Sequence, residues 1–267
     1  MMVLITGGSS GIGKDLARAY LTRGERVVIV AEKPEKLEAA RTDLARISPR
    51  VGAVACDVSD SAAVHRMVAS VLSDHGCPDV LVNNAGFAVY RSFEQSPPDE
   101  IEKLIGVNFL GAVRCIHGFL PAMIARRSGH IVNVASVAGL MPITPCAAYG
   151  AAKHGMVGLS ETLRFELREF DIRVHLVCPG RVETSFFDHE TYRRRPRRPE
   201  TEKTVSIEAV SQSIINAVEK NRFFTVIPRT LGWAIRIRNM CPSLVDLWLG
   251  RLLATRTREA RAIAAKS

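Results

Sequence analysis

Short runs of apolar residues alternate along this chain with longer segments in which apolar residues recur every three or four positions, and this alternation restricts the possible folds severely. The apolar runs cover residues 3–6, 26–31, 51–56, 79–83, 130–135 and 173–179, with a weaker one at 223–227. The helical segments include residues 14–23, 60–74, 100–126 and 149–170. Because runs that are apolar on both faces suit parallel strands covered by helices on each side, we predict an α/β fold with one doubly wound parallel sheet.

Composition places the chain among ordinary globular proteins. With 267 residues, 47% of them hydrophobic and 24% charged, it can bury a large core in one or two domains. None of the six cysteines forms a Cys-x-x-Cys pair, so we expect buried reduced thiols rather than disulfides or a zinc site, and a reducing compartment. The seven histidines have no ligand-like spacing, and no metal is expected. Because a strand begins at the first residues without a targeting segment before it, we expect a cytoplasmic protein.

The net charge of +9 is concentrated in two late segments. Residues 189–203 carry six Lys and Arg against three acids, and residues 229–267 carry eight against two, so the rest of the chain sums to zero. We therefore predict one α/β domain over residues 1–228, with a basic insertion at 185–206 that covers the substrate, and an amphipathic helical extension over residues 229–267.

A glycine-rich loop follows the first strand and leads directly into a helix. Its sequence, Thr6-Gly-Gly-Ser-Ser-Gly-Ile-Gly13, lets the backbone turn tightly and approach a pyrophosphate. The unpaired amides and the dipole at a helix start favour the negative charge of such a group. The strand, loop and helix together indicate a dinucleotide site, although the spacing is G-x-x-x-G-x-G rather than G-x-G-x-x-G.

Tyr149 and Lys153 are four residues apart on a predicted helix and therefore share one face. A phenol ordinarily titrates near pH 10, and a neighbouring ammonium is expected to lower that pKa. Ser136 follows a predicted strand, at the edge where parallel sheets place ligands, and its hydroxyl could hold a substrate oxygen. Taken together, these three residues indicate proton transfer to or from a substrate.

These motifs resemble those of a classical short-chain dehydrogenase/reductase over about residues 3–185. The family patterns are found as the glycine loop, an Asn-Asn-Ala-Gly sequence at residues 83–86, Asn108, Ser136, Tyr-x-x-x-Lys at 149–153 and Pro-Gly at 179–180. The resemblance implies that Tyr149 is the general acid/base and that Lys153 lowers its pKa and binds the nicotinamide ribose. It also implies that Ser136 orients the substrate and that Asn108 holds a water in a proton relay.

The resemblance further implies the residues that contact the cofactor. Asp57 is expected at the adenine, and Asn84 and the loop at 179–184 at the ribose and nicotinamide. The full predicted set is Gly7, Ser9, Ser10, Gly11, Ile12, Gly13, Glu32, Lys33, Asp57, Val58, Asn84, Ala85, Gly86, Tyr149, Lys153, Pro179, Gly180, Val182 and Thr184.

The residues after the second strand bear on the choice between NAD and NADP. In the family, an acid at the end of this strand favours NAD, and an arginine just beyond it binds the 2′-phosphate of NADP. Here Ala31 lacks the acid, Glu32 occupies the position of the arginine, and Lys33 offers a cation beside it. A carboxylate close to a phosphate dianion is costly, so the sequence favours NAD slightly.

Two interpretations fit the basic, apolar tail. Residues 231–254 contain Trp233 and Trp248 among aliphatic residues, but charges and Pro242 interrupt them too often for a membrane-spanning helix. They suit a helix pair at a membrane surface, with peripheral contact through residues 229–254, and they equally suit a cover over the substrate pocket or a subunit interface. Both interpretations point to a hydrophobic substrate, as does a vague similarity to 3-ketosphinganine reductases.

The sequence therefore predicts an NAD(P)-dependent oxidoreductase that interconverts a secondary alcohol and a ketone on a lipid-like molecule. A catalytically idle dinucleotide sensor or scaffold, which binds a partner or membrane through its basic segments, is the alternative. The arginine run at 193–198 lacks interleaved aromatic residues, so nucleic-acid binding is not expected. The family resemblance implies a homo-oligomer formed through the helices at 100–126 and 149–170.

Overall fold

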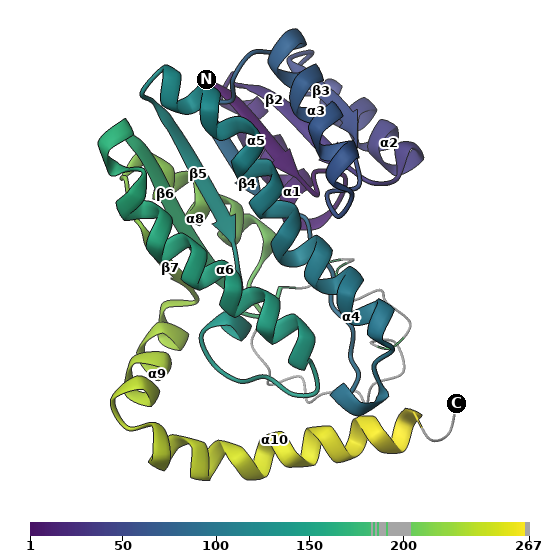
Figure 1. The fold of residues 1–267 in the computed structure, drawn as a ribbon, viewed down its shortest axis with the longest axis vertical. Helices are drawn as coiled ribbons and strands as arrows, with labels where there is room; N and C mark the ends of the chain where they lie inside the picture. The colour runs from purple at the N-terminus through teal and green to yellow at the C-terminus, as the bar shows by residue number, and fades with distance from the viewer. Residues whose placement is uncertain (183, 185, 187–190, 192–203, 265–267) are drawn as a thin grey trace.

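We describe a computed structural model of the chain (Figure 1). It covers residues 1–182, 184, 186, 191 and 204–264, and side chains are described for all of these except 244–249, 251, 252, 263 and 264. The arginine run at 193–198, most of the predicted insertion and the side chain of Trp248 lie outside the described part. All six strong apolar runs and the weaker seventh run form strands, so the predicted fold class is confirmed.

Seven parallel strands form one sheet in the order β3-β2-β1-β4-β5-β6-β7. The chain crosses from β1 to β2 and β3 on one side and then from β4 outward on the other, which is the doubly wound arrangement. The strands are β1 (Met2–Thr6), β2 (Arg26–Ala31), β3 (Val51–Ala55), β4 (Val80–Asn83), β5 (Gly129–Val134), β6 (Ile172–Pro179) and β7 (Phe224–Ile227).

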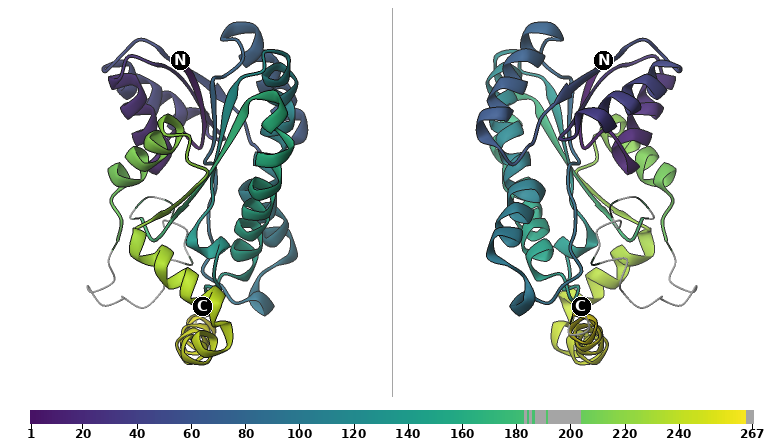
Figure 2. Two further views of the ribbon diagram at one scale, coloured as in Figure 1. Left: turned by 90° about the vertical axis from the view of Figure 1, so that its left-hand side faces the viewer. Right: turned by 90° about the vertical axis from the view of Figure 1, so that its right-hand side faces the viewer.

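Helices cover both faces of this sheet, as the two side views show (Figure 2). The strands β1 and β4, in the middle of the sheet, are buried along their whole length, because two apolar layers enclose them. The helices are α1 (Gly11–Thr22), α2 (Pro34–Ala45), α3 (Ser61–Asp74), α4 (Pro98–Ile105), α5 (Gly111–Ala125), α6 (Ala147–Glu166), α8 (Ile207–Glu219), α9 (Arg229–Met240) and α10 (Pro242–Ala264). Short 3-10 turns are η1 (Phe93–Gln95), η3 (Val137–Gly139) and η4 (Arg168–Phe170).

The helix predicted at 100–126 differs from the observed structure in one respect. A π-helical turn, η2 (Gly106–Leu110), separates α4 from α5. The combined segment Pro98–Ala125 is long and apolar enough to cross a membrane. However, α5 turns Cys115, Phe119 and Met123 into the core, where all three are fully buried. The segment is therefore accounted for as a core helix.

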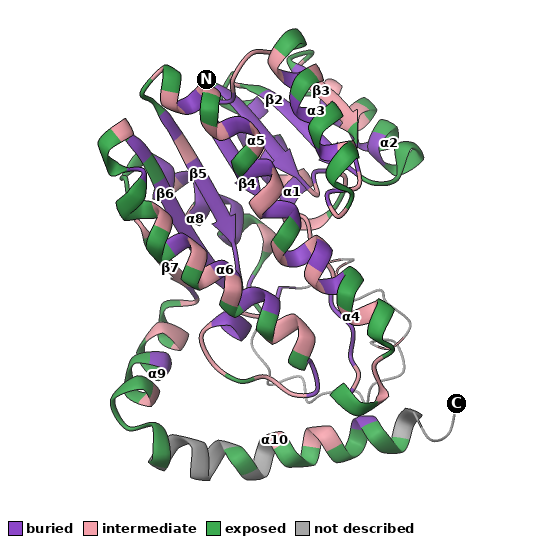
Figure 3. Ribbon diagram, in the orientation of Figure 1, coloured by how far each residue is buried: buried purple, intermediate pink, exposed green. Residues whose placement is uncertain are grey.

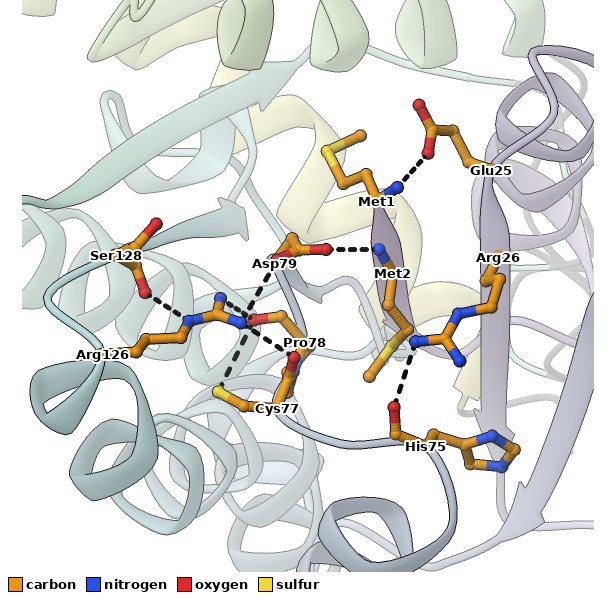
Figure 4. Close-up of polar contacts among 10 residues, drawn as sticks. All are labelled: Met1, Met2, Glu25, Arg26, His75, Cys77, Pro78, Asp79, Arg126 and Ser128. Atoms are coloured by element: carbon orange, nitrogen blue, oxygen red, sulfur yellow. Dashed lines mark hydrogen bonds and ion pairs between the residues drawn. The ribbon is translucent and has the colours of Figure 1, made fainter.

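Polar contacts hold together the edge of the sheet where the strands begin (Figure 4). The Asp79 carboxylate accepts a hydrogen bond from the backbone N–H of Met2 at 2.6 Å and pairs with Arg126 at 3.2 Å. The same guanidinium donates to the carbonyls of Cys77 and Pro78 at 3.0 and 2.7 Å. These contacts join β1, β4 and the end of α5 at the edge opposite to the one where ligands bind in such sheets.

The tail forms the two predicted helical segments, α9 and α10, which lie beyond the carboxyl ends of the strands (Figures 1 and 2). α9 packs against β7, and α10 runs on from it across that end of the molecule. The six cysteines form no disulfide with one another, and four of them are buried, in agreement with the sequence prediction.

Candidate active site

The loop between β1 and α1 needs glycines because its tight turn leaves no space for side chains, and its backbone can therefore approach a ligand. Gly7 has a φ of +66°, and a Cβ atom on Gly13 would lie 2.3 Å from the carbonyl oxygen of Gly7. α1 has no side-chain cap at Ser10 and no acidic residue in its first turn. Its first amides and its dipole are thus directed toward any anion held in the loop, which is what a pyrophosphate needs.

Thr6 and Asn84 fasten the glycine loop to the end of β4. The Thr6 hydroxyl accepts hydrogen bonds from the backbone N–H groups of Asn84 and Ala85 at 3.0 and 3.1 Å. In return, the Asn84 side-chain amide donates to the Thr6 carbonyl at 3.0 Å and to the Gly7 carbonyl at 3.3 Å. The two loops therefore form one rigid unit. The prediction assigned Asn84 to the cofactor and did not identify Thr6 as the residue that holds the loops together.

Ser136, Tyr149 and Lys153 meet at the carboxyl end of β5. Ser136 follows this strand, and its hydroxyl accepts from the N–H of Ala138 at 3.1 Å. Tyr149 is hydrogen-bonded to Ser136, and one helical turn further on α6 the Lys153 ammonium lies 5.7 Å from the centre of the tyrosine ring. Lys153 donates to the carbonyl of Val134, the last residue of β5, at 3.0 Å. Three residues separated in sequence thus converge on one point.

Burial dominates the acid–base properties of this group. It raises the pKa of the Tyr149 phenol above its usual range, and the hydrogen bond from Ser136 opposes that increase only in part. Burial also lowers the pKa of Lys153 to about 8. The expected lowering of the phenol pKa by Lys153 is not found in this structure, because both side chains share the same desolvated site. The phenol is accordingly protonated at neutral pH and can donate a proton.

Asn108 lies behind this group, in the π-helical turn η2. It is fully buried, and its amide donates to the carbonyls of Phe87 and Leu104 at 2.8 and 3.0 Å. Its side-chain oxygen has no hydrogen-bond partner among the described residues. A Cβ atom added to Gly86 would lie 2.5 Å from this oxygen and 3.7 Å from the Lys153 amine. Because Gly86 has no side chain, no Cβ atom intrudes between these two groups.

A single cavity of about 1060 Å³ joins the glycine loop to the Tyr149 group, which is enough for a dinucleotide and a further molecule. Gly13 and Asn108 are not part of its lining and lie directly behind it. The predicted site residues that line it are Gly7, Ser9, Ser10, Gly11, Ile12, Glu32, Lys33, Asp57, Val58, Asn84, Ala85, Gly86, Ser136, Tyr149, Lys153, Pro179, Gly180, Val182 and Thr184.

The far end of the cavity from Tyr149 carries mixed charge. Glu32 and Lys33 both line it, as the sequence prediction expects, and Lys36 from the first turn of α2 lines it too. Close by, Asp57 accepts hydrogen bonds from the backbone and the hydroxyl of Ser59 at 2.8 and 2.7 Å. These bonds fix the Asp57 carboxylate at the end of β3.

Apolar side chains that the sequence did not single out also line the cavity, together with the charged Asp99, Glu100, Lys103 and Arg256. The apolar ones come from Phe87, Met141 and Ile143, and from the tail through Leu231 and Leu253. Phe87 directly follows the Asn-Asn-Ala-Gly sequence, and this position could have predicted that it lines the cavity. Contacts between the tail and distant loops could not have been found in this way.

The second half of α10 is fastened to the loop that contains Thr144 and to η1. The Thr144 hydroxyl donates to the Leu253 carbonyl at 2.8 Å, and the Arg261 guanidinium pairs with the Glu94 carboxylate at 2.5 Å. Ala260 is buried in a cluster that includes Tyr90 and, at its border, Tyr149. This part of the tail thus covers the cavity, as one of the two sequence interpretations expects.

Comparison with known proteins identifies the family. The sequence profile of the family described as short chain dehydrogenase matches residues 1–194. Dehydrogenase/reductase SDR family protein 7-like of Anopheles gambiae is 36% identical over 189 residues, 69% of this chain and 60% of that protein, so the match spans less than two thirds of it. Dehydrogenase/reductase SDR family member 7B of Rattus norvegicus is 30% identical over 97% of this chain and 82% of its own length. A 3-ketodihydrosphingosine reductase of Bacteroides thetaiotaomicron is 32% identical over 88% of this chain and 81% of its own length.

Solved structures share the whole fold. A short-chain dehydrogenase/reductase of Burkholderia phymatum in complex with NAD superposes with a TM-score of 0.81 at 26% identity. The superposition covers 93% of this chain and 94% of the Burkholderia chain. A short-chain dehydrogenase of Sphingobium yanoikuyae in complex with NADPH has a TM-score of 0.79 at 27% identity, over 92% and 94% of the two chains. Their ligands agree with the predicted nicotinamide dinucleotide. The chain therefore belongs to the short-chain dehydrogenase/reductase family of oxidoreductases.

Proposed function

We propose that this protein interconverts a secondary alcohol and a ketone on an apolar, lipid-like molecule, with a nicotinamide dinucleotide as hydride donor or acceptor. The observation that carries the proposal is the convergence of Ser136, Tyr149 and Lys153 at one end of a cavity whose other end is the glycine loop. Hydride and proton must be exchanged at one carbon and its attached oxygen, so a cofactor and a proton donor must share one cavity.

The chain's own residues would handle the oxygen and its proton. Ser136 and the Tyr149 phenol, which are hydrogen-bonded to each other, would both hold the substrate oxygen. In ketone reduction the protonated phenol would give its proton to that oxygen, and in alcohol oxidation the phenolate would take it back. A bound nicotinamide dinucleotide supplies or accepts the hydride at the adjacent carbon.

Lys153 and Asn108 would help to pass a proton to or from the phenol. The Lys153 amine, with a pKa of about 8, exchanges protons readily near neutral pH. The partnerless oxygen of Asn108, on the other side of the space beside Gly86, offers an acceptor for a water between the two. We therefore assign Asn108 to a proton relay and not to substrate binding.

The apolar substrate is inferred from the apolar part of the cavity lining. Phe87, Met141, Ile143 and Leu253 belong to the lining of the cavity, and a hydrocarbon chain packed against them would be shielded from water. A similarity to a 3-ketodihydrosphingosine reductase supports the same substrate class. The cavity volume of about 1060 Å³ leaves room for a long molecule beside a dinucleotide.

We propose NAD as the preferred cofactor. Glu32 lines the cavity at the position where relatives that bind NADP carry an arginine, and a carboxylate there is costly beside a phosphate dianion, although Lys33 and Lys36 line the same end. The Glu32→Arg variant should then gain affinity for NADP and lose preference for NAD.

A steady-state assay tests the proposal directly. Wild type and Glu32→Arg would be assayed with NADH and NADPH against a series of ketones of increasing chain length. We expect kcat/KM to rise with chain length and the cofactor preference to reverse in the variant. Absence of turnover with every ketone, despite measurable cofactor binding, would favour the idle sensor over the enzyme.

A further inference from the structure

Helix α9 has two opposite faces with different environments. On one face, Ile235 is buried with 5% of its surface exposed, and Leu231 lines the cavity. The Leu231 side chain reaches so close to Gly180 that a Cβ atom there would lie 2.9 Å from it. This face therefore attaches the helix to β7 and to the loop that follows β6.

The other face exposes large apolar side chains. Trp233, Ile237 and Met240 are 64%, 57% and 81% exposed, and their spacing of four and three residues places them in one stripe. Most of α9 is exposed to solvent in the same way (Figure 3). Isolated exposed apolar residues are common, but a tryptophan within a continuous stripe along one helix indicates a surface that contacts something else.

The charges beside the stripe indicate what that contact is. Arg229 and Arg236 are exposed on its flank, and the Arg236 guanidinium lies 5.1 Å from the centre of the Trp233 ring. Residues 229–245 contain three arginines and no acid, and the whole segment 229–267 carries a net charge of +6. A helix with a tryptophan-containing apolar stripe and flanking arginines has the properties of one that lies in an anionic lipid interface.

We propose that α9 docks on an anionic lipid surface, with Trp233, Ile237 and Met240 inserted at the level of the headgroups and Arg229 and Arg236 beside the phosphates. A second copy of the chain fits less well on this face, because a symmetric contact would bring the arginines of the two copies together.

The same helix borders the cavity, which gives the docking a consequence. Leu231 lines the cavity on one side of α9, and Trp233 starts the exposed stripe on the other, two residues further on. A docked helix would place the Tyr149 end of the cavity close to the lipid, so an apolar substrate could pass between them without crossing water. This delivery rests on the proposed function, whereas the docking itself does not.

Vesicle sedimentation tests the docking with the full-length protein. The probes are vesicles of phosphatidylcholine alone and of phosphatidylcholine mixed with phosphatidylserine. We expect wild type to bind the mixed vesicles, and the combined variant Trp233→Ser, Ile237→Ser and Met240→Ser to bind them at least about tenfold more weakly. Replacing Arg229 and Arg236 by glutamine should weaken binding by about fivefold for each residue and reduce its dependence on phosphatidylserine and on salt.

A matched control comes from α6. Phe165 is 63% exposed, nearly the same as Trp233, but lies on a different helix, so Phe165→Ser should bind vesicles like wild type. Thermal melting checks that the serine variants remain folded. Equal binding by wild type and the triple variant would overturn the proposal. So would a triple variant that keeps vesicle binding but changes the oligomeric state in light scattering, because the face would then be a subunit interface.

A second pair of measurements separates this inference from the proposed function. Tyr149→Phe should lose activity and still bind vesicles like wild type, because the docking does not involve the phenol. With an active enzyme, the triple variant should raise KM for a long-chain ketone presented in vesicles and leave KM for a short, water-soluble ketone unchanged. An equal effect on both ketones would contradict the delivery of substrate from the lipid.

Discussion

The ammonium of Lys153 lies 5.7 Å from the centre of the Tyr149 ring and gives a hydrogen bond to the backbone of β5 at 3.0 Å. The sheet, and not the tyrosine, therefore fixes the position of the amine. Because α6 carries both residues, the phenol is fixed relative to the same strand. The catalytic proposal depends on this rigid relationship between α6 and β5.

Removing the Tyr149 hydroxyl should abolish turnover and spare the fold. Since a positioned proton donor contributes about 10²–10⁴-fold to a rate, Tyr149→Phe should lower kcat by about that factor. The dissociation constant of the cofactor, measured by fluorescence titration, should change little. Tyr20→Phe is a matched control, because its hydroxyl is buried in α1 without a partner among the described residues and far from the cavity. Equal losses of kcat in both variants would contradict the assigned role of Tyr149.

A methyl group at Gly13 should damage the cofactor site. The Cβ atom of Gly13→Ala would lie 2.3 Å from the Gly7 carbonyl oxygen, so the loop must move. We expect cofactor affinity to fall at least about tenfold, measured by titration calorimetry. At Gly158, on exposed α6 surface, a Cβ atom meets nothing within 4 Å, and Gly158→Ala should leave affinity unchanged and raise stability by up to about 1 kcal/mol. Unchanged affinity in Gly13→Ala would refute this account of the loop.

The buried His175, which is paired with the half-buried His130, should make the fold sensitive to acid. The His175 Nδ1 atom donates to the Arg222 carbonyl at 2.8 Å, so in the neutral ring the Nε2 atom accepts from His130 at 2.9 Å. Burial lowers the pKa of His175 to about 4, from 6.5 in an unfolded chain. The unfolded state therefore binds more protons between pH 6.5 and 4, and stability must fall as pH falls through this range, by about 3 kcal/mol from this group.

Denaturant unfolding at a series of pH values measures this effect. His175→Asn should show a smaller loss of stability between pH 6.5 and 4 than wild type, whatever its stability at neutral pH. His154→Gln changes a histidine that is exposed on α6 and should leave the pH dependence as it is. A His175→Asn variant with the slope of wild type would show that another group is responsible for acid unfolding.

The ion pair between Glu94 and Arg261 should hold the end of α10 in place. The two side chains lie 2.5 Å apart and connect the tail to η1. Glu94→Gln and Arg261→Gln should each speed limited proteolysis of the tail, and the double variant should add little to either. Glu38→Gln breaks a comparable exposed pair with Arg41, within α2, and should not alter the cleavage rate. Full additivity of the two tail substitutions would mean that the residues do not act together.

The strands and the catalytic group were predictable because their signals are local. A strand buried on both faces must be apolar throughout, and a Tyr-x-x-x-Lys pair on a helix must share a face, so both can be read from neighbouring residues. The sequence says less where tertiary contacts decide. The helix predicted at 100–126 is continuous over Pro98–Ala125, but local spacing does not reveal its π turn, where the Asn108 amide bonds to Phe87, a residue 21 positions away.

The surroundings of Tyr149 are a second case in which tertiary contacts decide. The spacing placed an ammonium near a phenol, but not the burial of both, and burial has the larger effect. The place of the tail was also left open between a pocket cover and a surface helix. Residues of α10 border the cavity while α9 keeps an exposed apolar stripe, so each interpretation fits a different part of the tail.

Gly86 limits which amino acids this position can accept, because it has no side chain. Any other residue there would place a carbon 2.5 Å from the Asn108 oxygen and 3.7 Å from the Lys153 amine. In the proposed relay, even alanine at this position would interrupt the supply of protons without contacting a reacting atom.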